Sequence, residues 1–223
     1  LPIYASTPKT PEEKAVILSD GEVVTVGQMA QMRNPESKFV MEELHDAPLL
    51  ALLADSSEGL STGDGDRFIC QHWEVGFLEL DVSVWEPLQE APPEHSLYAG
   101  LRKIVKWEDG LGQLAGFSQA RIQGQLGWGR KGILVSEMTN LSACLHIGFK
   151  HYKMAGVVVP TQNISLEALY AFCTSDDYVN RVRQVDKSLK VAPKSLVRVP
   201  FERDRWESVG ASLFPNGLPQ PYS

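Results

Sequence analysis

The stretch Gly132-Ile133-Leu134-Val135-Ser136-Glu137 is an apolar run of strand length, and it begins the part of the chain that decides the fold class. Residues 144–149 and 156–159 are similar runs and predict two more strands. Ser165 and Ser175 are good N-caps, and each predicts the start of a helix. Strands and helices mix without a regular β-α-β rhythm. The sequence therefore predicts an α+β fold with a mixed, mostly antiparallel sheet and packed helices.

The second of these helices is predicted to bury one stripe of side chains. Tyr178, Val182, Val185 and Leu189 fall at helical spacing and form that stripe. Three cations lie away from this stripe: Arg181, Arg183 and Lys187.

Outward from this region, local signals such as proline, glycine and β-branched residues predict the remaining elements. The expected elements are an extended lead-in over residues 1–12, strands at 22–26, 38–41, 104–107 and 196–201, a helix over 46–59, a structured turn and short helix over 59–68, and a loop over 87–100.

Size and composition indicate an ordinary globular protein. The chain has 223 residues, of which 43% are hydrophobic and 22% charged, which suits one large domain or two small ones. No apolar run approaches the roughly 20 residues that a membrane span needs. The start, Leu1-Pro2-Ile3-Tyr4, has no signal-peptide pattern and no initiator Met, so we expect a fragment of a longer chain or a processed chain. Three unpaired cysteines predict reduced thiols and a cytoplasmic protein: Cys70, Cys144 and Cys173.

Charge is distributed unevenly along the sequence. The formal net charge is -7. Residues 1–97 contain 5 Lys+Arg and 18 Asp+Glu, whereas residues 98–206 contain 16 Lys+Arg and 9 Asp+Glu. Such contrast can mark a nucleic-acid face on the basic half, or simply two solvated surfaces of different composition.

Two motifs resemble ligand sites weakly. Gly110-x-Gly112-x-x-x-Gly116 follows a candidate strand, with Glu137 about twenty positions on, but no apolar helix pattern follows as a dinucleotide site requires. Cys144-x-His146 with His151 offers fewer ligands than the four of a typical zinc site, so a core cysteine and hydrogen-bonded histidines are the better interpretation. We predict no catalytic residue and no metal in this chain.

The segment Trp128-Gly129-Arg130-Lys131-Gly132 carries two adjacent cations between glycines. Such a loop can bring Arg and Lys against phosphates while the backbone approaches closely. A solvated hairpin with Trp128 in the core is the alternative.

Several ordered segments resemble the target-recognition region of large bacterial adenine-specific DNA methyltransferases, that is, single-chain type II restriction-modification enzymes and BREX phage-defence methyltransferases. The matching segments cover roughly residues 22–223 and are Gly59 to Phe68 with Trp73-Glu74-Val75, Trp128 to Ile133, Tyr170 to Ser175, Val182 to Val191, Leu196 to Phe201, Trp206, and Pro215 to Ser223.

The resemblance implies a target-recognition-domain-like fold that docks on double-stranded DNA and presents one adenine for methylation at N6. It also implies that the parent enzyme uses S-adenosylmethionine, bound by an upstream methyltransferase domain of the same chain. The family's Asn-Pro-Pro-Tyr-type motif and its cofactor turn are not in this sequence, and Asn34-Pro35-Glu36-Ser37 lacks the second proline and the aromatic residue. We therefore expect neither catalysis nor cofactor binding by this chain alone.

Three regions follow from this interpretation: 1–45 as the tail of the methyltransferase domain and lead-in, 46–208 as the DNA target-recognition domain, and 209–223 as an extended C-terminal segment. The predicted DNA-binding residues are Lys106, Arg130, Lys131, Lys190 and Lys194. A structural turn, with Arg67 paired to a neighbouring carboxylate, is predicted for Asp64, Asp66 and Arg67. Two rival functions remain open: a nucleotide-binding enzyme domain built on Gly110 to Gly116, and a protein-interaction module of a phage-defence complex.

Overall fold

The chain divides into two units, Leu1–Asp46 and Ala47–Ser223. The structure is a computed structural model that describes residues 10–20, 27, 47–76, 81–138 and 140–221. The strands predicted at 22–26 and 38–41 lie outside the described residues. Within the described part of the chain, no helix is long and apolar enough to cross a membrane.

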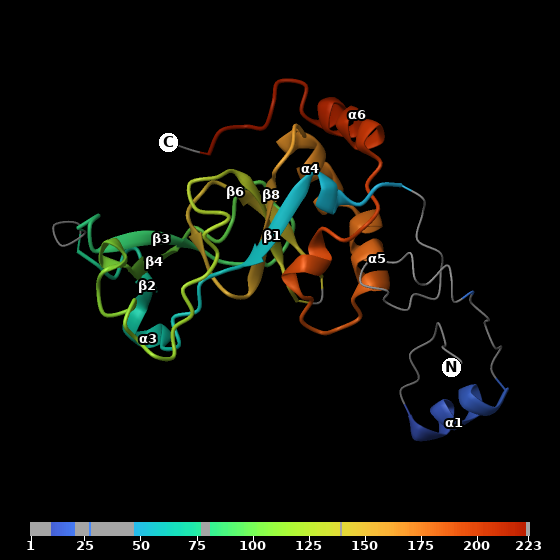
Figure 1. Ribbon diagram of the computed structural model, residues 1–223, viewed down its shortest axis with the longest axis horizontal. Helices are drawn as coiled ribbons and strands as arrows, with labels where there is room; N and C mark the ends of the chain where they lie inside the picture. The colour runs from blue at the N-terminus through green and yellow to red at the C-terminus, as the bar shows by residue number, and fades with distance from the viewer. Residues whose placement is uncertain (1–9, 21–26, 28–46, 77–80, 139, 222–223) are drawn as a thin grey trace. The chain divides into compact units, whose positions relative to one another are not determined.

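The described segment of the first unit is helix α1, Pro11–Asp20 (Figure 1). A capping box starts it: the Glu13 amide donates to the Thr10 hydroxyl at 3.2 Å, and the Thr10 amide donates to the Glu13 carboxylate at 3.2 Å. The extended lead-in predicted over 1–12 is therefore wrong from Pro11 onward, because a proline suits the first turn of a helix.

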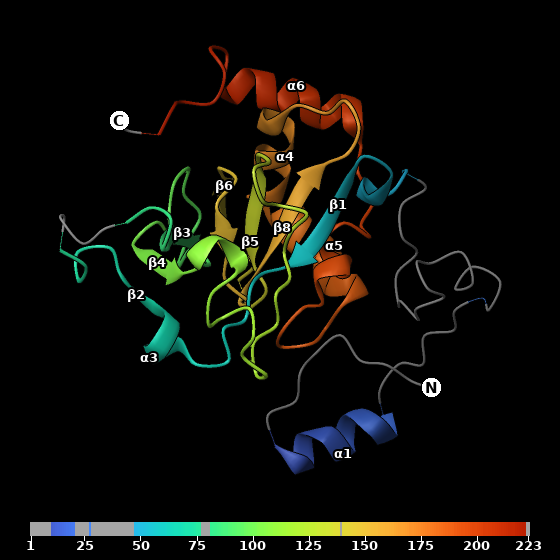
Figure 2. The same cartoon turned by 60° about the vertical axis from the view of Figure 1, so that its left-hand side comes forward.

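The second unit confirms the α+β class, with two mostly antiparallel four-stranded sheets. The first sheet is antiparallel throughout, in the order β1-β8-β5-β6 (Figure 2). Its strands are β1 (Ala54–Glu58), β5 (Gly132–Ser136), β6 (Ala143–His146) and β8 (Ala155–Pro160). Every residue of β5 is buried, as expected of a central strand whose two faces are both covered.

The second sheet has the order β2-β4-β3-β7, and β7 pairs with β3 in parallel. Its strands are β2 (Ile69–Gln71), β3 (Trp85–Gln89), β4 (Lys103–Lys106) and β7 (Lys150–His151). The two sheets are joined at Gln89, whose side-chain amide donates to the Leu145 carbonyl of β6 at 2.9 Å. Short helices complete the unit: α3 (Gly65–Phe68) and 3-10 helices at Leu50–Leu52, Glu108–Gly110 and Pro193–Leu196.

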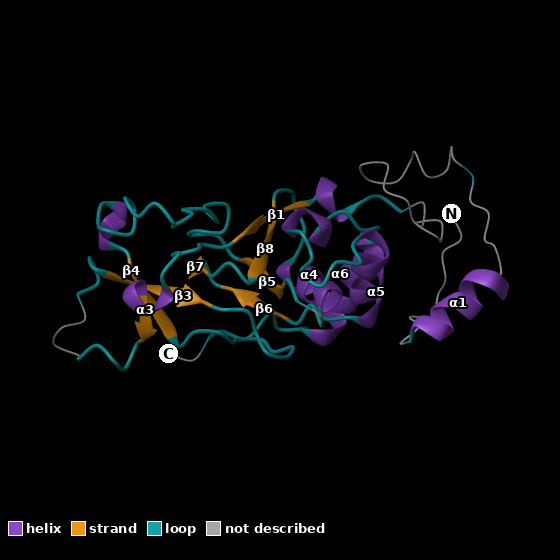
Figure 3. Cartoon of the chain, turned by 90° about the horizontal axis from the view of Figure 1, so that it is seen from below, coloured by secondary structure: helices purple, strands orange, loops and turns teal. Residues whose placement is uncertain are grey.

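Three longer helices gather beside the first sheet (Figure 3). They are α4 (Leu166–Cys173), α5 (Asp176–Val185) and α6 (Arg203–Leu213). The two predicted caps are confirmed: the Ser165 hydroxyl accepts from the Ala168 amide and the Ser175 hydroxyl from the Tyr178 amide, both at 3.1 Å. Helix α4 is buried from Ala168 onward and packs against α6 and β5.

Two predicted elements are wrong because a non-local pairing replaces them. The helix predicted over 46–59 is one 3-10 turn followed by β1, and the strand predicted over 196–201 is irregular. The two segments bond to each other, since the Leu50 amide donates to the Val199 carbonyl at 2.9 Å. Tertiary pairing therefore outweighs local propensity in both segments.

Helix α5 ends earlier than its apolar pattern predicts. It stops at Val185, so Leu189 of the predicted stripe is 70% exposed. Arg181, which lies away from the predicted stripe, is also buried. Its guanidinium donates to Asp177 at 2.7 Å and to Glu202 at 2.9 Å, and these partners compensate the charge.

Two predicted loop regions contain regular structure. Strand β3 includes part of the loop predicted over 87–100; β7 pairs only with residues beyond Pro87, so this proline lies at an edge where it is tolerated. The predicted extended segment 209–223 is helical as far as Leu213, because α6 packs on α4 through Gly210. A Cβ at Gly210 would lie 2.6 Å from the Ala168 amide nitrogen.

Candidate nucleic-acid interface

The basic loop, defined as residues 124–132, leads into β5 and is held by main-chain hydrogen bonds. The Gly129 amide donates to the Gly148 carbonyl at 2.8 Å, and the Arg130 amide donates to the Gly127 carbonyl at 3.1 Å. Gly129 has φ +69°, a conformation that favours glycine. The backbone that carries the two predicted cations is therefore fixed in place.

Trp128 anchors the same loop. Its ring lies 5.3 Å from that of Trp107 in a T-shaped contact, and the Lys150 ammonium sits 4.3 Å from the Trp107 ring centroid and 4.6 Å from that of Trp128. Lys150 is buried and also pairs with Glu86, so its charge is compensated. Trp128 is partly buried and packs against the core cluster that contains Trp107, while the neighbouring cations are exposed.

Arg130 and Lys131 are both exposed and adjacent. The Arg130 guanidinium donates to the Pro160 carbonyl at 2.8 Å, which directs the side chain without neutralising it. Among the described residues, neither cation has a carboxylate within ion-pair distance. Two uncompensated positive charges thus stand side by side on a fixed loop.

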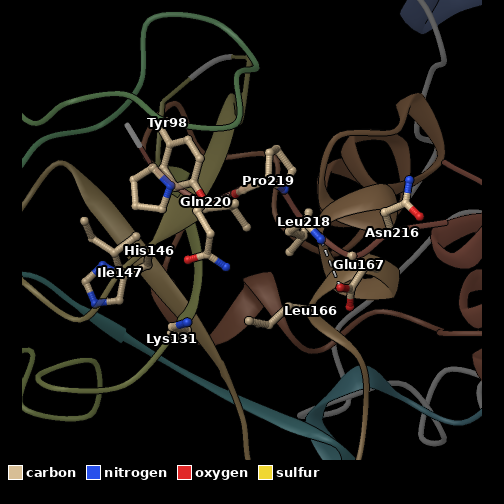
Figure 4. A pocket seen from close by; sticks show the side chains of 13 residues that line it. Tyr98, Lys131, His146, Ile147, Leu166, Glu167, Asn216, Leu218, Pro219 and Gln220 are labelled. Atoms are coloured by element: carbon tan, nitrogen blue, oxygen red, sulfur yellow. Dashed lines mark hydrogen bonds between the residues drawn. The ribbon is translucent and has the colours of Figure 1, made fainter. Parts of the chain in front are cut away.

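Lys131 also lines a cavity of about 620 Å³ beside β6, the start of α4 and the C-terminal segment. In Figure 4 its ammonium faces the Gln220 amide across the cavity. The C-terminal segment is tied down by the Tyr98 hydroxyl, which donates to the Pro219 carbonyl, and by Glu167, which accepts from the Leu218 amide at 3.3 Å. The lining also includes the Glu167 carboxylate and the Asn216 amide, so the cavity presents both signs of charge beside apolar walls.

The other three predicted DNA-binding cations face carboxylates. Lys106 lies 3.7 Å from Glu108. The Lys194 ammonium lies 2.5 Å from Asp55 on β1. Lys190 bridges two acids, Glu58 and Glu137. These three charges are at least partly compensated within the fold, which distinguishes them from the pair on the basic loop.

Lys190 lies between Glu58 at the end of β1 and Glu137, which follows β5. Glu137 is fully buried, and its carboxylate lies 3.1 Å from the Lys190 ammonium. Burial raises the pKa of Glu137 to about 7, although Lys190 acts in the opposite direction. A neighbouring cavity of about 340 Å³ is lined by Asp55 and Glu58, so this side of the sheet edge is mixed in charge.

Among the described residues, acids of the first half of the sequence lie beside cations of the second half. Four ion pairs each join an acid of the first half to a lysine of the second, and they are Glu58–Lys190, Asp55–Lys194, Glu86–Lys150 and Glu90–Lys103. These lysines of the basic half are therefore paired with acids, and a DNA-facing surface would depend on individual side chains.

The Gly-Asp-rich turn contains a local cap. Asp64 is the N-cap of α3 and accepts from the Arg67 amide at 3.2 Å, while Asp66 lies in the first turn. Instead of an ion pair with either carboxylate, the Arg67 guanidinium donates to Gln113 at 2.8 Å and stacks over the Phe68 ring.

The Gly110 to Gly116 segment does not form the strand-turn-helix of a dinucleotide site. Gly110 ends a 3-10 helix with φ +75°, and the described residues that follow are turns. Glu137, the acid at the expected spacing, is buried beside Lys190 instead of standing at a pocket mouth. The geometry therefore gives the nucleotide-binding alternative no support.

Cys144, His146 and His151 are buried in the core, but neither ring nitrogen of His151 has a hydrogen-bond partner in the described residues. In the described residues, no three His, Cys, Asp or Glu side chains are grouped so as to hold a metal ion. Burial raises the pKa of the Cys144 thiol to about 12, so it stays protonated. The two ring nitrogens of His146 lie beside the side-chain oxygen of Gln89 and the carbonyl oxygen of Gly127.

Sequence reasoning missed the cavity, because Tyr98, Lys131, Glu167 and Gln220 come from four distant segments. The resemblance had included the C-terminal segment without giving it a role. A scan against protein-family models and a search of curated proteins found no match for this chain.

Proposed function

We propose that the second unit binds double-stranded DNA through the basic loop, and that it serves as the target-recognition part of a site-specific adenine-N6 methyltransferase in restriction-modification or phage defence. The observation that carries the proposal is the pair Arg130 and Lys131, exposed on a fixed loop without a carboxylate partner in the described part of the chain. Phosphate groups are the ligands that such a pair suits best.

The proposal assigns recognition to this chain and chemistry elsewhere. Methyl transfer from S-adenosylmethionine would belong to a methyltransferase domain of the same parent chain, as the resemblance implies. The fixed backbone of the loop supports recognition, because a cation held in one place costs less ordering entropy on binding than a mobile one.

The experiment measures the affinity of the 223-residue chain for duplex DNA by fluorescence anisotropy, at two salt concentrations about fourfold apart. Arg130→Ala/Lys131→Ala should weaken binding and reduce the slope of log affinity against log salt by about one unit per lost phosphate contact. Arg102→Ala/Lys187→Ala is the matched control, because it removes two other exposed cations and the same net charge.

An equal loss in both double variants would assign the effect to net charge and reject the loop. Unchanged binding by Arg130→Ala/Lys131→Ala, with a lowered melting temperature, would assign the pair to folding. If the unaltered chain shows no salt-dependent binding at all, the proposed function is wrong.

A further inference from the structure

The imidazole of His146 is almost fully buried, at 1% exposure, and both of its ring nitrogens face carbonyl oxygens. Nδ1 lies 2.9 Å from the side-chain oxygen of Gln89, and Nε2 lies 3.0 Å from the main-chain oxygen of Gly127. Gly127 belongs to the basic loop, so this ring links β6 directly to the backbone that carries Arg130 and Lys131.

The orientation of the Gln89 amide is fixed by its own partners. Its nitrogen donates to the Leu145 carbonyl at 2.9 Å and to the Ala99 carbonyl at 3.1 Å. Turning the amide over would place its oxygen against both carbonyls. His146 therefore has an acceptor on each side, and a neutral imidazole can donate to only one of them.

The surroundings keep His146 neutral. Burial lowers its pKa, and the contact with the Gly127 carbonyl only partly offsets that effect. The His151 ring, 5.3 Å away, is itself held neutral because burial lowers its pKa to about 3. The Cys144 thiol on the same strand is protonated. Lys131 and Glu167, which line the same cavity as His146, carry opposite charges.

One proton must therefore be placed on one of the two nitrogens. The Gly127 carbonyl is a main-chain group held in a turn by the Arg130 amide, and it cannot turn away from an opposing lone pair. The Gln89 amide cannot turn over, but small rotations about its last torsion are soft and keep its two carbonyl contacts, so the repulsion is relieved more easily there. The placement that costs less puts the proton on Nε2.

Close packing supports a direct role for this contact. A Cβ at position 127 would lie 3.0 Å from His146 Nε2 and 2.9 Å from a methyl carbon of Val157. Glycine is thus needed for the loop to approach the ring.

We propose that His146 is a positioning residue for the DNA-binding loop, and that it acts by donating its Nε2 proton to the Gly127 carbonyl. The expected effect on DNA affinity rests on the proposed function, whereas the contact between His146 and the basic loop does not. Loss of one such hydrogen bond changes an equilibrium by about fivefold.

Two conservative variants separate the two ring nitrogens. Counted in bonds from Cβ, the amide nitrogen of Gln corresponds to Nε2 and that of Asn to Nδ1. His146→Gln should keep the Gly127 bond, the slow amide exchange of Arg130 and the affinity for DNA. His146→Asn should speed exchange of the Arg130 amide and trypsin cleavage at the loop by about fivefold, and weaken DNA binding by a similar factor.

The nitrogen-15 spectrum of His146 in the unaltered chain provides a readout that does not depend on how the variants fold. Protonation at Nε2 supports the proposal, and protonation at Nδ1 overturns it. Equal loop exchange in His146→Asn and His146→Gln, without DNA present, also overturns it. Loosening of the loop in His146→Asn in a chain that never binds DNA would support the positioning role and reject the proposed function.

Discussion

Replacing Lys190 by Met tests whether this lysine serves the fold or DNA. In the structure it is the cation beside the fully buried Glu137, and it also pairs with Glu58. Lys190→Met keeps most of the side-chain stem and removes the charge. We expect a loss of stability that grows with pH above neutrality.

The magnitude follows from the pKa of Glu137, about 7 in the fold against an ordinary value of 4.5. The folded chain binds the extra proton, so this group's contribution to stability is complete below 4.5 and is lost as the pH rises to about 7. Above about pH 7, Glu137 is ionised in both the folded and the unfolded chain, so the stability of the unaltered chain no longer changes with pH through this group. Without Lys190 the folded pKa rises further, so stability keeps falling by about 1.4 kcal/mol per pH unit.

The assay is urea unfolding of both chains at several values between about pH 7 and pH 9, compared as differences so that other titrations cancel. Glu137→Gln/Lys190→Met is the control, since it removes the titrating carboxylate and should abolish the slope. A difference that stays flat with pH would refute the role of Lys190 as counterion of Glu137. Lower DNA affinity in Lys190→Met with unchanged stability would indicate that Lys190 contacts DNA.

Two further results are expected. Burial lowers the pKa of His151 to about 3, so below its ordinary pKa of 6.5 this histidine is neutral in the folded chain and protonated in the unfolded chain. The folded chain therefore loses stability as the pH falls below 6.5, by about 2 kcal/mol at about pH 5 relative to His151→Leu. A difference in the free energy of urea unfolding that stays constant with pH would contradict this. Ser175 accepts from the Tyr178 amide at the start of α5, so Ser175→Ala should lower the free energy of unfolding by about 1 kcal/mol, measured by thermal or urea unfolding, whereas an unchanged midpoint would show that the cap is dispensable.

The elements that sequence predicted well are those whose signals are local. The buried strands β5 and β8 are continuous apolar runs, and the caps Ser165 and Ser175 precede their helices directly. Strand β1 gave no such signal, because Asp55 to Glu58 is polar and becomes a strand only by pairing with β8. Its partner lies in a distant part of the chain.

The candidate site shows the same limit. Sequence could name Arg130 and Lys131 as adjacent cations between glycines, since that pattern is contiguous. It could not tell that Lys190 and Lys194 face carboxylates on or next to distant strands. Nor could it tell that the ring of His146 lies under the loop, because that contact depends on how β6 packs.

The pairing between Leu50 and Val199 has a consequence for biosynthesis. A ribosome releases the chain from the N-terminus, so Leu50 leaves the exit tunnel long before the residue that accepts its amide proton. The second unit can therefore form this pairing only when nearly all of it has been translated. Until then its early segments are without this partner and must not pair with other strands. Contacts of such long sequence separation also make folding slow. A polypeptide whose synthesis ends before Val199 cannot form the pairing between Leu50 and Val199.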